Sequence, residues 1–382
     1  MPSSFGRSAA VVLLGGLFSL AALAQNDGAR WLDVQFPLDS PVLPVSFSLG
    51  PTTARVKGMS MALELHASLL IRNNGRKPLS GLTLRVEAQD LTPAGKGSVT
   101  TPSLDVLPGE VFPVKIDMEL LRPFNVGKSN GAMVQVSLDC ALFNDLTSYG
   151  PDKLGSRRSL VVYELQARRD RQYLAGLLEA KQLAQLREEL NFGLRDFSPQ
   201  RIGLELLRDP SSAQRAEQVL AVSALRFPNA PVQALGGGAH ISGNEIRSPH
   251  VEVKNNSGKP VRSIDMGWII RDGRGRDFAA GSIAGNLPLA PVETGTMSET
   301  GVLRFSSLVG QPIFIEGLSA FVSDVEFGDG KLWIPSRSDI EAATTDPALR
   351  RVLATSPEQQ RLAEIYRRKG ISGLADELRR TY

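Results

Sequence analysis

The stretch IRNNGRKPLSGLTLRV at residues 71–86 returns, with substitutions, as VKNNSGKPVRSIDMGW at residues 253–268. Both versions place an Asn-Asn pair before a Lys-Pro pair, and both continue with apolar residues at alternate positions. Asn73 therefore corresponds to Asn255, an offset of 182 residues that relates every shared position in the two stretches. We interpret the two stretches as copies of one structural unit.

The residues around the first copy have the pattern of a half-buried strand and a turn. Apolar residues alternate with polar ones from Met61 to Ile71, which is the period of a strand with one buried face. The Asn-Asn-Gly triplet at Asn73 suits a tight turn, and Pro78, which lacks an N–H, suits a strand start. The alternation then resumes in both copies, at Leu82, Leu84 and Val86 and at Ile264, Met266 and Trp268.

A second pair of similar stretches follows, ALFNDLTSYGPDKL at 141–154 and AFVSDVEFGDGKLW at 320–333. Their alignment places Asp145 on Asp324, at an offset of 179 residues, and implies that a loop between the two blocks has lost three residues. Asp329 and the glycine after it form a strong signal for a hairpin. The second copy is therefore expected to close with a hairpin.

Short strands separated by turns rich in glycine and proline are typical of antiparallel sandwiches. A chain of 382 residues also exceeds what one hydrophobic core usually supports. We therefore predict a mainly β fold with helical segments, in which two antiparallel immunoglobulin-like β-sandwiches are each followed by α-helices. The expected segments are a first sandwich at 31–165, a helical connector at 166–230, a second sandwich at 231–336 and C-terminal helices at 337–382.

The phrases that end the two expected hairpin regions are distinctive. A strand that ends in NN-x-x-KP and a closing strand that ends in F-x-DG-x-x-W resemble those of uncharacterised exported bacterial proteins with tandem immunoglobulin-like or fibronectin-like β-sandwich domains. The resemblance covers the two predicted β regions. It implies export and a β-sandwich fold, and it implies no activity.

Four expected helix starts share a capping residue followed by proline, an arrangement that satisfies the exposed N–H groups of a first helical turn. These starts are Ser198-Pro199, Asp209-Pro210, Asp346-Pro347 and Ser356-Pro357. Ser356 and Gln359 also fit a capping box, and Gly370 suits a C-terminal stop. In the connector, Leu183, Leu186 and Leu190 form a stripe that predicts either a helix packed on a sandwich or on other helices, or a coiled-coil seam.

The N-terminal residues have the composition of a secretory signal peptide. Arg7 is the only charged residue before an apolar run from Ala9 to Ala24 that ends in small residues. We predict a signal peptide at 1–24, cleavage after Ala24, no stable membrane span thereafter, and a periplasmic or secreted protein. The alternative is an uncleaved anchor, for which the run is shorter than the roughly 20 residues that a spanning helix needs.

The net charge and the single cysteine each give a limited prediction. The net charge of +3 is too small to indicate a nucleic-acid partner. Cys140, the single cysteine, lies among apolar residues that alternate with polar ones, so we expect an inert thiol on the buried face of a strand.

Chemistry-bearing residues are few and scattered. His66, His240 and His250 lack the spacing of a zinc site, and His240 follows three glycines in an expected linker. Ser60 lies in a segment one residue short of a nucleophile elbow, and that segment leads into a strand where the elbow needs a helix.

The remaining polar clusters have local structural interpretations. The residues from Arg271 to Asp277 suit a solvated hairpin tip, and Asp145 and Asp324 suit turn geometry. We assign no catalytic, cofactor-binding or metal-ligating residue and no cofactor. The leading hypothesis is a non-enzymatic exported binding or scaffold protein with an envelope protein or glycan as its partner. The alternatives are a carboxylate-dependent hydrolase acting on envelope polymers and an architectural subunit of an envelope assembly.

Overall fold

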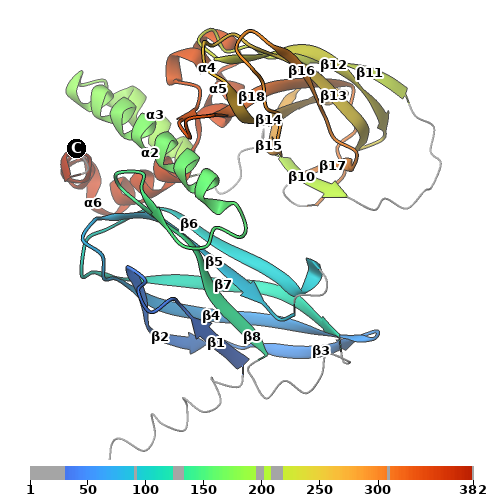
Figure 1. Cartoon of the computed structure of the whole chain (residues 1–382). Helices are drawn as coiled ribbons and strands as arrows, with labels where there is room; N and C mark the ends of the chain where they lie inside the picture. The colour runs from blue at the N-terminus through green and yellow to red at the C-terminus, as the bar shows by residue number, and fades with distance from the viewer. Residues whose placement is uncertain are drawn as a thin grey trace, which may run out of the picture. The chain divides into compact units, whose positions relative to one another are not determined.

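The computed structural model describes residues 31–89, 93–123, 133–194, 202–207, 218–307 and 310–380. Within them the chain is mainly β with five α-helices, which confirms the predicted fold class at this level. The chain divides into two compact units, Met1–Leu160 and Val161–Tyr382 (Figure 1). The predicted signal peptide at 1–24 lies outside the described residues. None of the described helices combines the length and apolar character that a membrane crossing requires.

The first unit consists of nine strands and one 3₁₀ turn in its described part. They are β1 (Leu32–Gln35), β2 (Val42–Leu49), β3 (Thr53–Lys57), β4 (Ser60–Asn73), β5 (Leu79–Glu87), η1 (Pro93–Gly95), β6 (Lys96–Val106), β7 (Val111–Pro123), β8 (Val134–Phe143) and β9 (Ser148–Tyr149). A five-stranded sheet has the order β1-β8-β5-β6, with β9 paired to β8, and a four-stranded sheet has the order β2-β4-β3, with β7 paired to β4.

Both sheets of the first unit contribute to one hydrophobic core. Leu65 of β4 and Ile116 of β7 belong to it, together with Leu84 of β5 and Val136 of β8, and all four are fully buried. The predicted strand from 61 to 71 is confirmed within β4. The prediction for Cys140 is also confirmed, because its side chain lies on β8 with 1% of its surface exposed.

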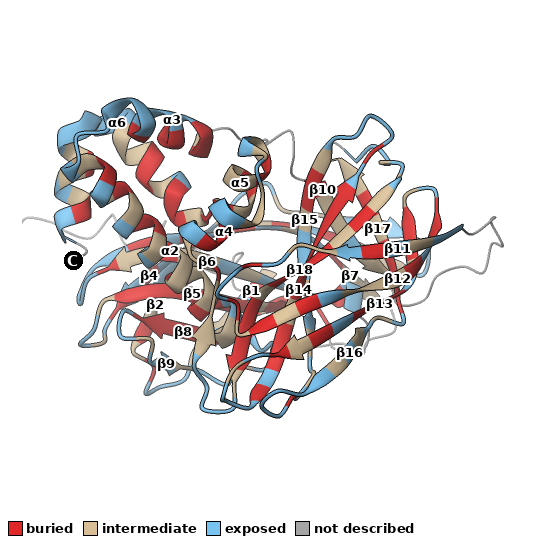
Figure 2. Ribbon diagram, turned by 90° about the horizontal axis from the view of Figure 1, so that it is seen from above, coloured by how far each residue is buried: buried red, intermediate tan, exposed pale blue. Residues whose placement is uncertain are grey.

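The second unit contains most of α2 and all later elements. They are α2 (Ser156–Glu179), α3 (Leu183–Gly193), β10 (Ile202–Leu207), β11 (Gln218–Ala224), β12 (Val232–Ser242), β13 (Glu245–Asn255), β14 (Val261–Arg271), β15 (Asp277–Gly285), β16 (Thr294–Ser298), β17 (Val302–Ser307), β18 (Gly317–Phe327), β19 (Leu332–Trp333), α4 (Arg337–Ala343), α5 (Pro347–Ala354) and α6 (Pro357–Arg380). Along β13, buried residues alternate with exposed or half-buried ones for much of its length (Figure 2).

The second unit corrects the prediction of two separate sheets at 231–336. Its strands form one ten-stranded sheet in the order β10-β17-β13-β12-β11-β18-β14-β15, with β16 paired to β13 and β19 to β18. The sheet is continuous because β11 pairs with β12 on one side and with β18 on the other. Its two ends approach each other, since a Cβ atom at Gly281 of β15 would lie 3.9 Å from Leu204 of β10.

The two units share a sequence of strand pairings. The order β1-β8-β5-β6 with β9 on β8 matches the order β11-β18-β14-β15 with β19 on β18, and the first pair is parallel in both. The amide of Asn73 donates to the carbonyl of Lys77 at 2.9 Å, and that of Asn255 donates to the carbonyl of Lys259 at 2.8 Å. The quoted stretches therefore adopt the same turn in both units.

The register of the closing strands corrects the alignment of Asp145 with Asp324. Asp145 binds the ammonium group of Lys77, and Asp329 binds that of Lys259. Each of these carboxylates also accepts a hydrogen bond at 3.1 Å from the backbone N–H two residues later. Asp329 is thus the counterpart of Asp145, and the second copy has gained two residues where a loss of three was expected.

The connector at 166–230 is not wholly helical. Helix α2 begins earlier than expected, at Ser156, and strands β10 and β11 occupy part of the region predicted to be helical. The expected linker around His240 lies within β12. These strands were missed because glycines and short polar stretches weaken the local pattern, whereas pairing with distant strands decides the structure.

The helix-start predictions have mixed outcomes. Asp346 caps α5 as predicted, because its side chain accepts from the N–H of Ala348. Ser356 accepts from the N–H of Gln359, but the side chain of Gln359 turns to another partner, so only half of the capping box forms. Gly370 has a φ of 68° and interrupts α6 as expected. The starts at Ser198 and Asp209 lie outside the described residues.

Candidate ligand-binding site

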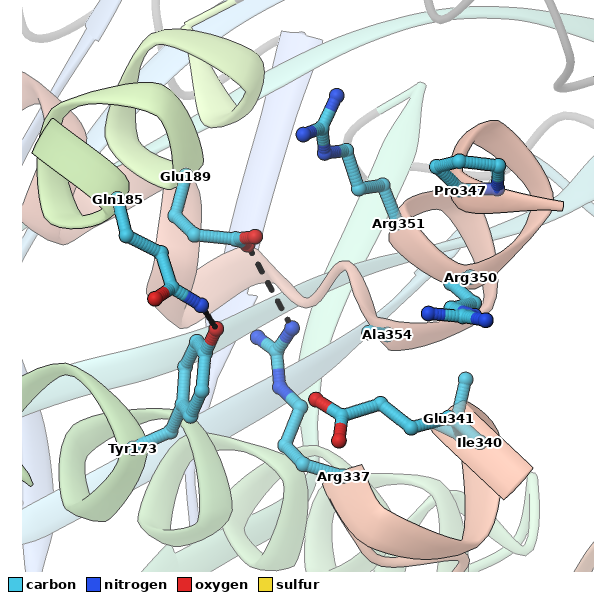
Figure 3. A pocket seen from close by; sticks show the side chains of 10 residues that line it. All are labelled: Tyr173, Gln185, Glu189, Arg337, Ile340, Glu341, Pro347, Arg350, Arg351 and Ala354. Carbon is cyan, nitrogen blue, oxygen red and sulfur yellow. Dashed lines mark hydrogen bonds and ion pairs between the residues drawn. The ribbon is translucent and has the colours of Figure 1, made fainter. Parts of the chain in front are cut away.

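A cavity of about 150 Å³ lies within the second unit, between helices α2, α3, α4 and α5 (Figure 3). Two side chains of α3, Gln185 and Glu189, face Arg350 and Arg351 of α5 across it. Tyr173 of α2 and two charged side chains of α4 complete the polar lining. The cavity is therefore polar and carries charges of both signs.

Apolar packing places these helices. Leu186 and Leu190 of α3 are fully buried against Leu174 of α2 and Leu362 of α6. This confirms that Leu186 and Leu190 of the predicted stripe pack on neighbouring helices and not in a coiled-coil seam, whereas Leu183 is exposed. Helices α4 and α5 pack in turn on the ten-stranded sheet, through a core that includes Ile340, Leu349 and Val352 of the helices and Ile269 and Phe321 of the sheet.

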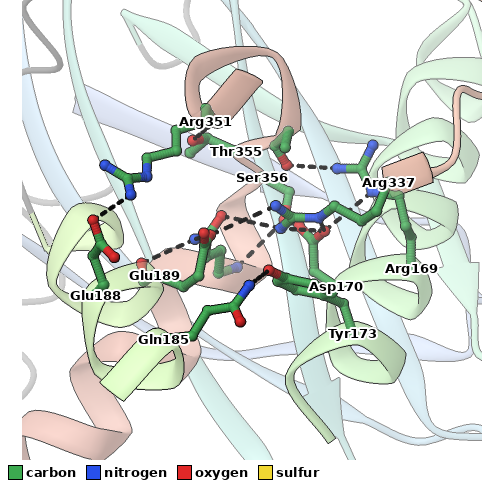
Figure 4. A network of polar contacts seen from close by, with 12 residues as sticks. Arg169, Asp170, Tyr173, Gln185, Glu188, Glu189, Arg337, Arg351, Thr355 and Ser356 are labelled. Carbon is green, nitrogen blue, oxygen red and sulfur yellow. Dashed lines mark hydrogen bonds and ion pairs between the residues drawn. The ribbon is translucent and has the colours of Figure 1, made fainter. Parts of the chain in front are cut away.

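A buried ion network lies behind the cavity (Figure 4). The carboxylate of Asp170 has no exposed surface, and it accepts from Arg337 at 2.8 Å, from Arg169 at 3.0 Å and from the hydroxyl of Ser356. Arg169 also donates to two backbone carbonyls, so each charge of this core has several partners. Charge-assisted hydrogen bonds of this kind hold the side chain of Arg337 in one position at the cavity wall.

Glu189 has a weaker set of partners. Its carboxylate lies 3.7 Å from a guanidinium nitrogen of Arg337 and 3.5 Å from the amide nitrogen of Gln359. Burial raises the pKa of Glu189, and the nearby guanidinium groups of Arg337 and Arg351 only partly oppose this effect. The charge of Glu189 is therefore incompletely compensated by the protein.

Tyr173 adds a hydroxyl group to the cavity floor. Its oxygen accepts a hydrogen bond of 3.1 Å from the side-chain amide of Gln185. The guanidinium of Arg337 lies over its ring, 4.6 Å from the centroid, which is a cation–π geometry. Burial is the main cause that raises the pKa of Tyr173, so the hydroxyl stays protonated at neutral pH and can donate as well as accept.

The arginines of α5 form the cationic side of the cavity. Arg350 donates from Nε to the carbonyl of Thr344 at 2.6 Å, and within the described residues its terminal nitrogens have no protein partner. Arg351 forms an ion pair with Glu188, which is more than half exposed. Arg350 and Arg351 therefore border the cavity with N–H donors that the contacts described above do not use.

The arrangement suits binding of a small polar molecule better than metal coordination. Glu341 of α4 also lines the cavity, so two carboxylates and three guanidinium groups surround it. Within the described ranges no group of three or more histidine, cysteine, aspartate or glutamate side chains could hold a metal ion.

The residues singled out in the sequence lie apart from this cavity. His66 lies on β4 in the first unit, with Nδ1 2.9 Å from a carboxylate oxygen of Asp117, whereas His240 and His250 lie on β12 and β13 of the second unit. Ser60 begins β4 directly, so the strand–turn–helix context of a nucleophile elbow is missing there.

The glycine-rich segment after β14 is a closed hairpin tip. One oxygen of Asp272 accepts from the N–H groups of Arg274 and Arg276, each at 3.0 Å, and the other pairs with the Arg276 guanidinium at 2.7 Å. These contacts agree with the structural interpretation of this loop.

Sequence reasoning assigned none of the cavity residues to a functional site. Among these residues, the local signal is the placement of Glu189 beside Leu186 and Leu190, which puts a carboxylate next to the apolar stripe of α3.

Comparison with known proteins does not assign the chain to a family, since neither a family model nor a curated protein matches it. Among solved structures, vicilin from hazelnut (Corylus avellana) aligns at 10% identity over 79% of this chain and 94% of that chain, with a TM-score of 0.08. A likeness of that degree carries no argument about fold or function.

Proposed function

We propose that the protein is an exported, non-enzymatic binding protein built from a duplicated immunoglobulin-like unit, and that its second unit takes a small polar ligand in the helical cavity. The matched turns at Asn73 and Asn255 and the matched strand order support the duplication. The resemblance to exported bacterial proteins and the signal-like segment at 1–24 support export to the periplasm or beyond. In this proposal the partner of the first unit is an envelope protein or glycan.

One observation carries the proposal of a ligand site. The network around Asp170 is complete without Arg350 and Glu341, because Arg169, Arg337 and Ser356 already satisfy that carboxylate. Arg350 and Glu341 add charge to the cavity wall and are not needed to balance this network. Charged groups that are held in place but not paired in the protein are suited to recognise a polar ligand.

The test is recovery of the ligand from exported protein. Native mass spectrometry of the full chain, purified gently from the envelope fraction, should show a bound species of low mass. Arg350→Gln should lose that species, whereas Arg367→Gln, which removes an exposed guanidinium paired with Glu364 on α6, should retain it. The ligand site would be ruled out if the wild-type chain shows only the mass of the protein itself and if adding the low-mass envelope fraction does not raise its unfolding temperature.

A second candidate, a carboxylate-dependent hydrolase, rests on a specific observation. Glu189, whose pKa is raised by burial, and Glu341 line the same cavity, and two carboxylates in one cavity can serve as acid and base. The two candidates differ in the fate of the ligand. A binding protein returns it chemically unchanged after prolonged incubation, whereas a hydrolase cleaves it and loses that activity in Glu189→Gln.

A further inference from the structure

We propose that the cavity binds a small zwitterion, an α-amino acid with a compact side chain, whose carboxylate faces Arg350 and Arg351 and whose ammonium group faces Glu189. This inference rests on the proposed function, because it assigns a ligand class to the same cavity. It follows from the size of the cavity, from the opposite charges of its two sides and from the partners that these charges lack.

The size of the cavity limits the ligand to a few heavy atoms. The cavity is partly open, and its volume of about 150 Å³ accommodates a molecule the size of benzene, which has six heavy atoms. Alanine also has six heavy atoms. Ile340, Pro347 and Ala354 contribute apolar surface to the lining, so a methyl group has neighbours there as well. A sugar chain or a folded peptide could not be contained within this volume.

The α5 side of the cavity suits a carboxylate. A guanidinium group presents its donors in a planar fork that matches the two oxygens of a carboxylate. The terminal nitrogens of Arg350 have no protein partner within the described residues, and its Nε is fixed by the carbonyl of Thr344. Arg350 is therefore oriented before the ligand arrives and keeps its donors for it.

The α3 side suits an ammonium group. Glu189 is buried, its contact with Arg337 is long at 3.7 Å, and a cation beside it would supply the missing compensation. The hydroxyl oxygen of Tyr173 and the side-chain oxygen of Gln185 provide further acceptors, and an ammonium group can donate three hydrogen bonds. This side therefore has acceptors where the opposite side has donors.

A zwitterion satisfies both sides at once. An anion alone would pair with the arginines but leave Glu189 uncompensated and further desolvated. A cation alone would pair with Glu189 but leave Arg350 without a partner and further desolvated. Either outcome leaves a desolvated charge without its partner, which is costly. The charges of the cavity therefore favour a ligand that carries both an anion and a cation a few atoms apart.

The experiment compares alanine with two fragments of it, each of which lacks one of the two charged groups. Isothermal titration of the full-length chain uses L-alanine, propionate, which lacks the ammonium group, and ethylamine, which lacks the carboxylate. Alanine should bind about tenfold or more tightly than either fragment, since each fragment loses one charge-assisted interaction. The same titrations are made with Arg350→Gln, Arg350→Lys, Glu189→Gln and the exposed control Arg367→Gln, after thermal unfolding confirms that each variant is folded.

The variants should change the preference among ligands and not only the strength of binding. Glu189→Gln should weaken alanine to the level of propionate and leave propionate itself unchanged or tighter. Arg350→Gln should weaken alanine about tenfold or more, and Arg350→Lys should fall between it and the wild type, because the charge remains but the fork is lost. Arg367→Gln should match the wild type.

Three results would overturn the inference. If propionate binds the wild type as tightly as alanine, the ligand is a simple anion, and the proposed binding function survives without the zwitterion. If alanine binds equally to the wild type, Arg350→Gln and Glu189→Gln, its site lies elsewhere. If none of the three compounds binds but the native ligand species is present and depends on Arg350, the class is wrong and the function stands.

Discussion

The two units use the same turn but close their β-structure differently. In the first unit, β1 is four residues long and pairs only with β8, so the two sheets remain separate. In the second unit, the matching strand β11 is seven residues long and pairs with both β12 and β18, which joins all strands into one sheet. The strand at the end of a sheet in the first unit therefore has an interior counterpart in the second, while the turn at the Asn-Asn phrase is unchanged.

The units also differ in how buried acids are satisfied. In the second unit, Asp170 is surrounded by two arginines and Ser356, all from helices or their caps. In the first unit, Asp139 is also buried, but it accepts from the hydroxyl of Ser156 and the N–H of Leu154 at the start of α2. An acid bound by neutral donors leaves no buried cation behind when it is removed, and this difference yields the largest predicted effect.

Asp170→Ala should destabilise the second unit by about 3–5 kcal/mol, because it leaves the charges of Arg169 and Arg337 buried without their shared partner. Asp139→Ala should destabilise the first unit by less, about 1–3 kcal/mol, since only neutral donors lose their acceptor. Hydrogen exchange followed by mass spectrometry on each full-length variant assigns the loss to a unit. Equal losses of stability in the two variants would show that leaving two buried arginines without Asp170 costs no more than leaving neutral donors without Asp139.

Asn73→Ala and Asn255→Ala form the next comparison. Each asparagine is fully buried, donates to backbone carbonyls across its turn and accepts from the N–H two residues later. Each substitution leaves buried backbone groups without partners and should cost about 1–3 kcal/mol of stability in its own unit. Urea unfolding and hydrogen exchange measure both. A loss in one variant alone would break the equivalence of the two turns.

The exposed ion pairs beside these turns should contribute least to stability. Lys77, by its hydrogen bond, lowers the pKa of Asp145 from its ordinary 3.8 to about 2, and Lys259 lowers the pKa of Asp329 in the same way. A lowered pKa in the folded state means that the pair stabilises the fold above about pH 4 and that this contribution disappears as the pH falls toward 2. Lys77→Met should cost less than about 1 kcal/mol, since the pair is exposed.

The measurement for the ion pairs is an NMR titration of the two aspartates. Lys77→Met should return the pKa of Asp145 toward its ordinary value and leave that of Asp329 lowered, and Lys259→Met should have the opposite selectivity. Stability of Lys77→Met measured at pH 7 and at pH 2 should differ from the wild type at pH 7 only. A lowered pKa of Asp145 that persists without Lys77 would point to the hydrogen bonds from Thr147 as the dominant cause.

Sequence alone was sufficient for the features that depend on neighbours along the chain. The alternation in β4, the turn at Asn73 and the cap at Asp346 each involve residues within a few positions of one another. The pairing of β11 with two distant strands could not be predicted, because no local pattern specifies which strand edges meet. The same limit explains the wrong alignment of Asp145 with Asp324. That alignment followed sequence similarity, whereas the correct register is defined only by the pairing of the strands.

The candidate site was beyond sequence reasoning for a related physical reason. Its charged groups come from four helices between Tyr173 and Arg351, and each helix taken singly resembles a solvated amphipathic surface. Only packing of the leucines of α2, α3 and α6, and of α4 and α5 on the sheet, turns those surfaces toward one another. The run Arg169-Asp170-Arg171 was a visible signal, but charge runs on helices most often face water.

The smallest expected effect concerns Cys140, at a position where the two units differ in chemistry. In the strand registers Cys140 pairs with Thr83, and Asp324 occupies the matching place opposite Asp265. Burial raises the pKa of the Cys140 thiol to about 12, so at pH 8 almost none of it is the reactive thiolate. The native chain should therefore show negligible labelling by a bulky maleimide over hours, and full labelling once urea unfolds the first unit. Rapid labelling of the folded chain, with no gain on adding urea, would mean that β8 does not carry the buried face assigned to it.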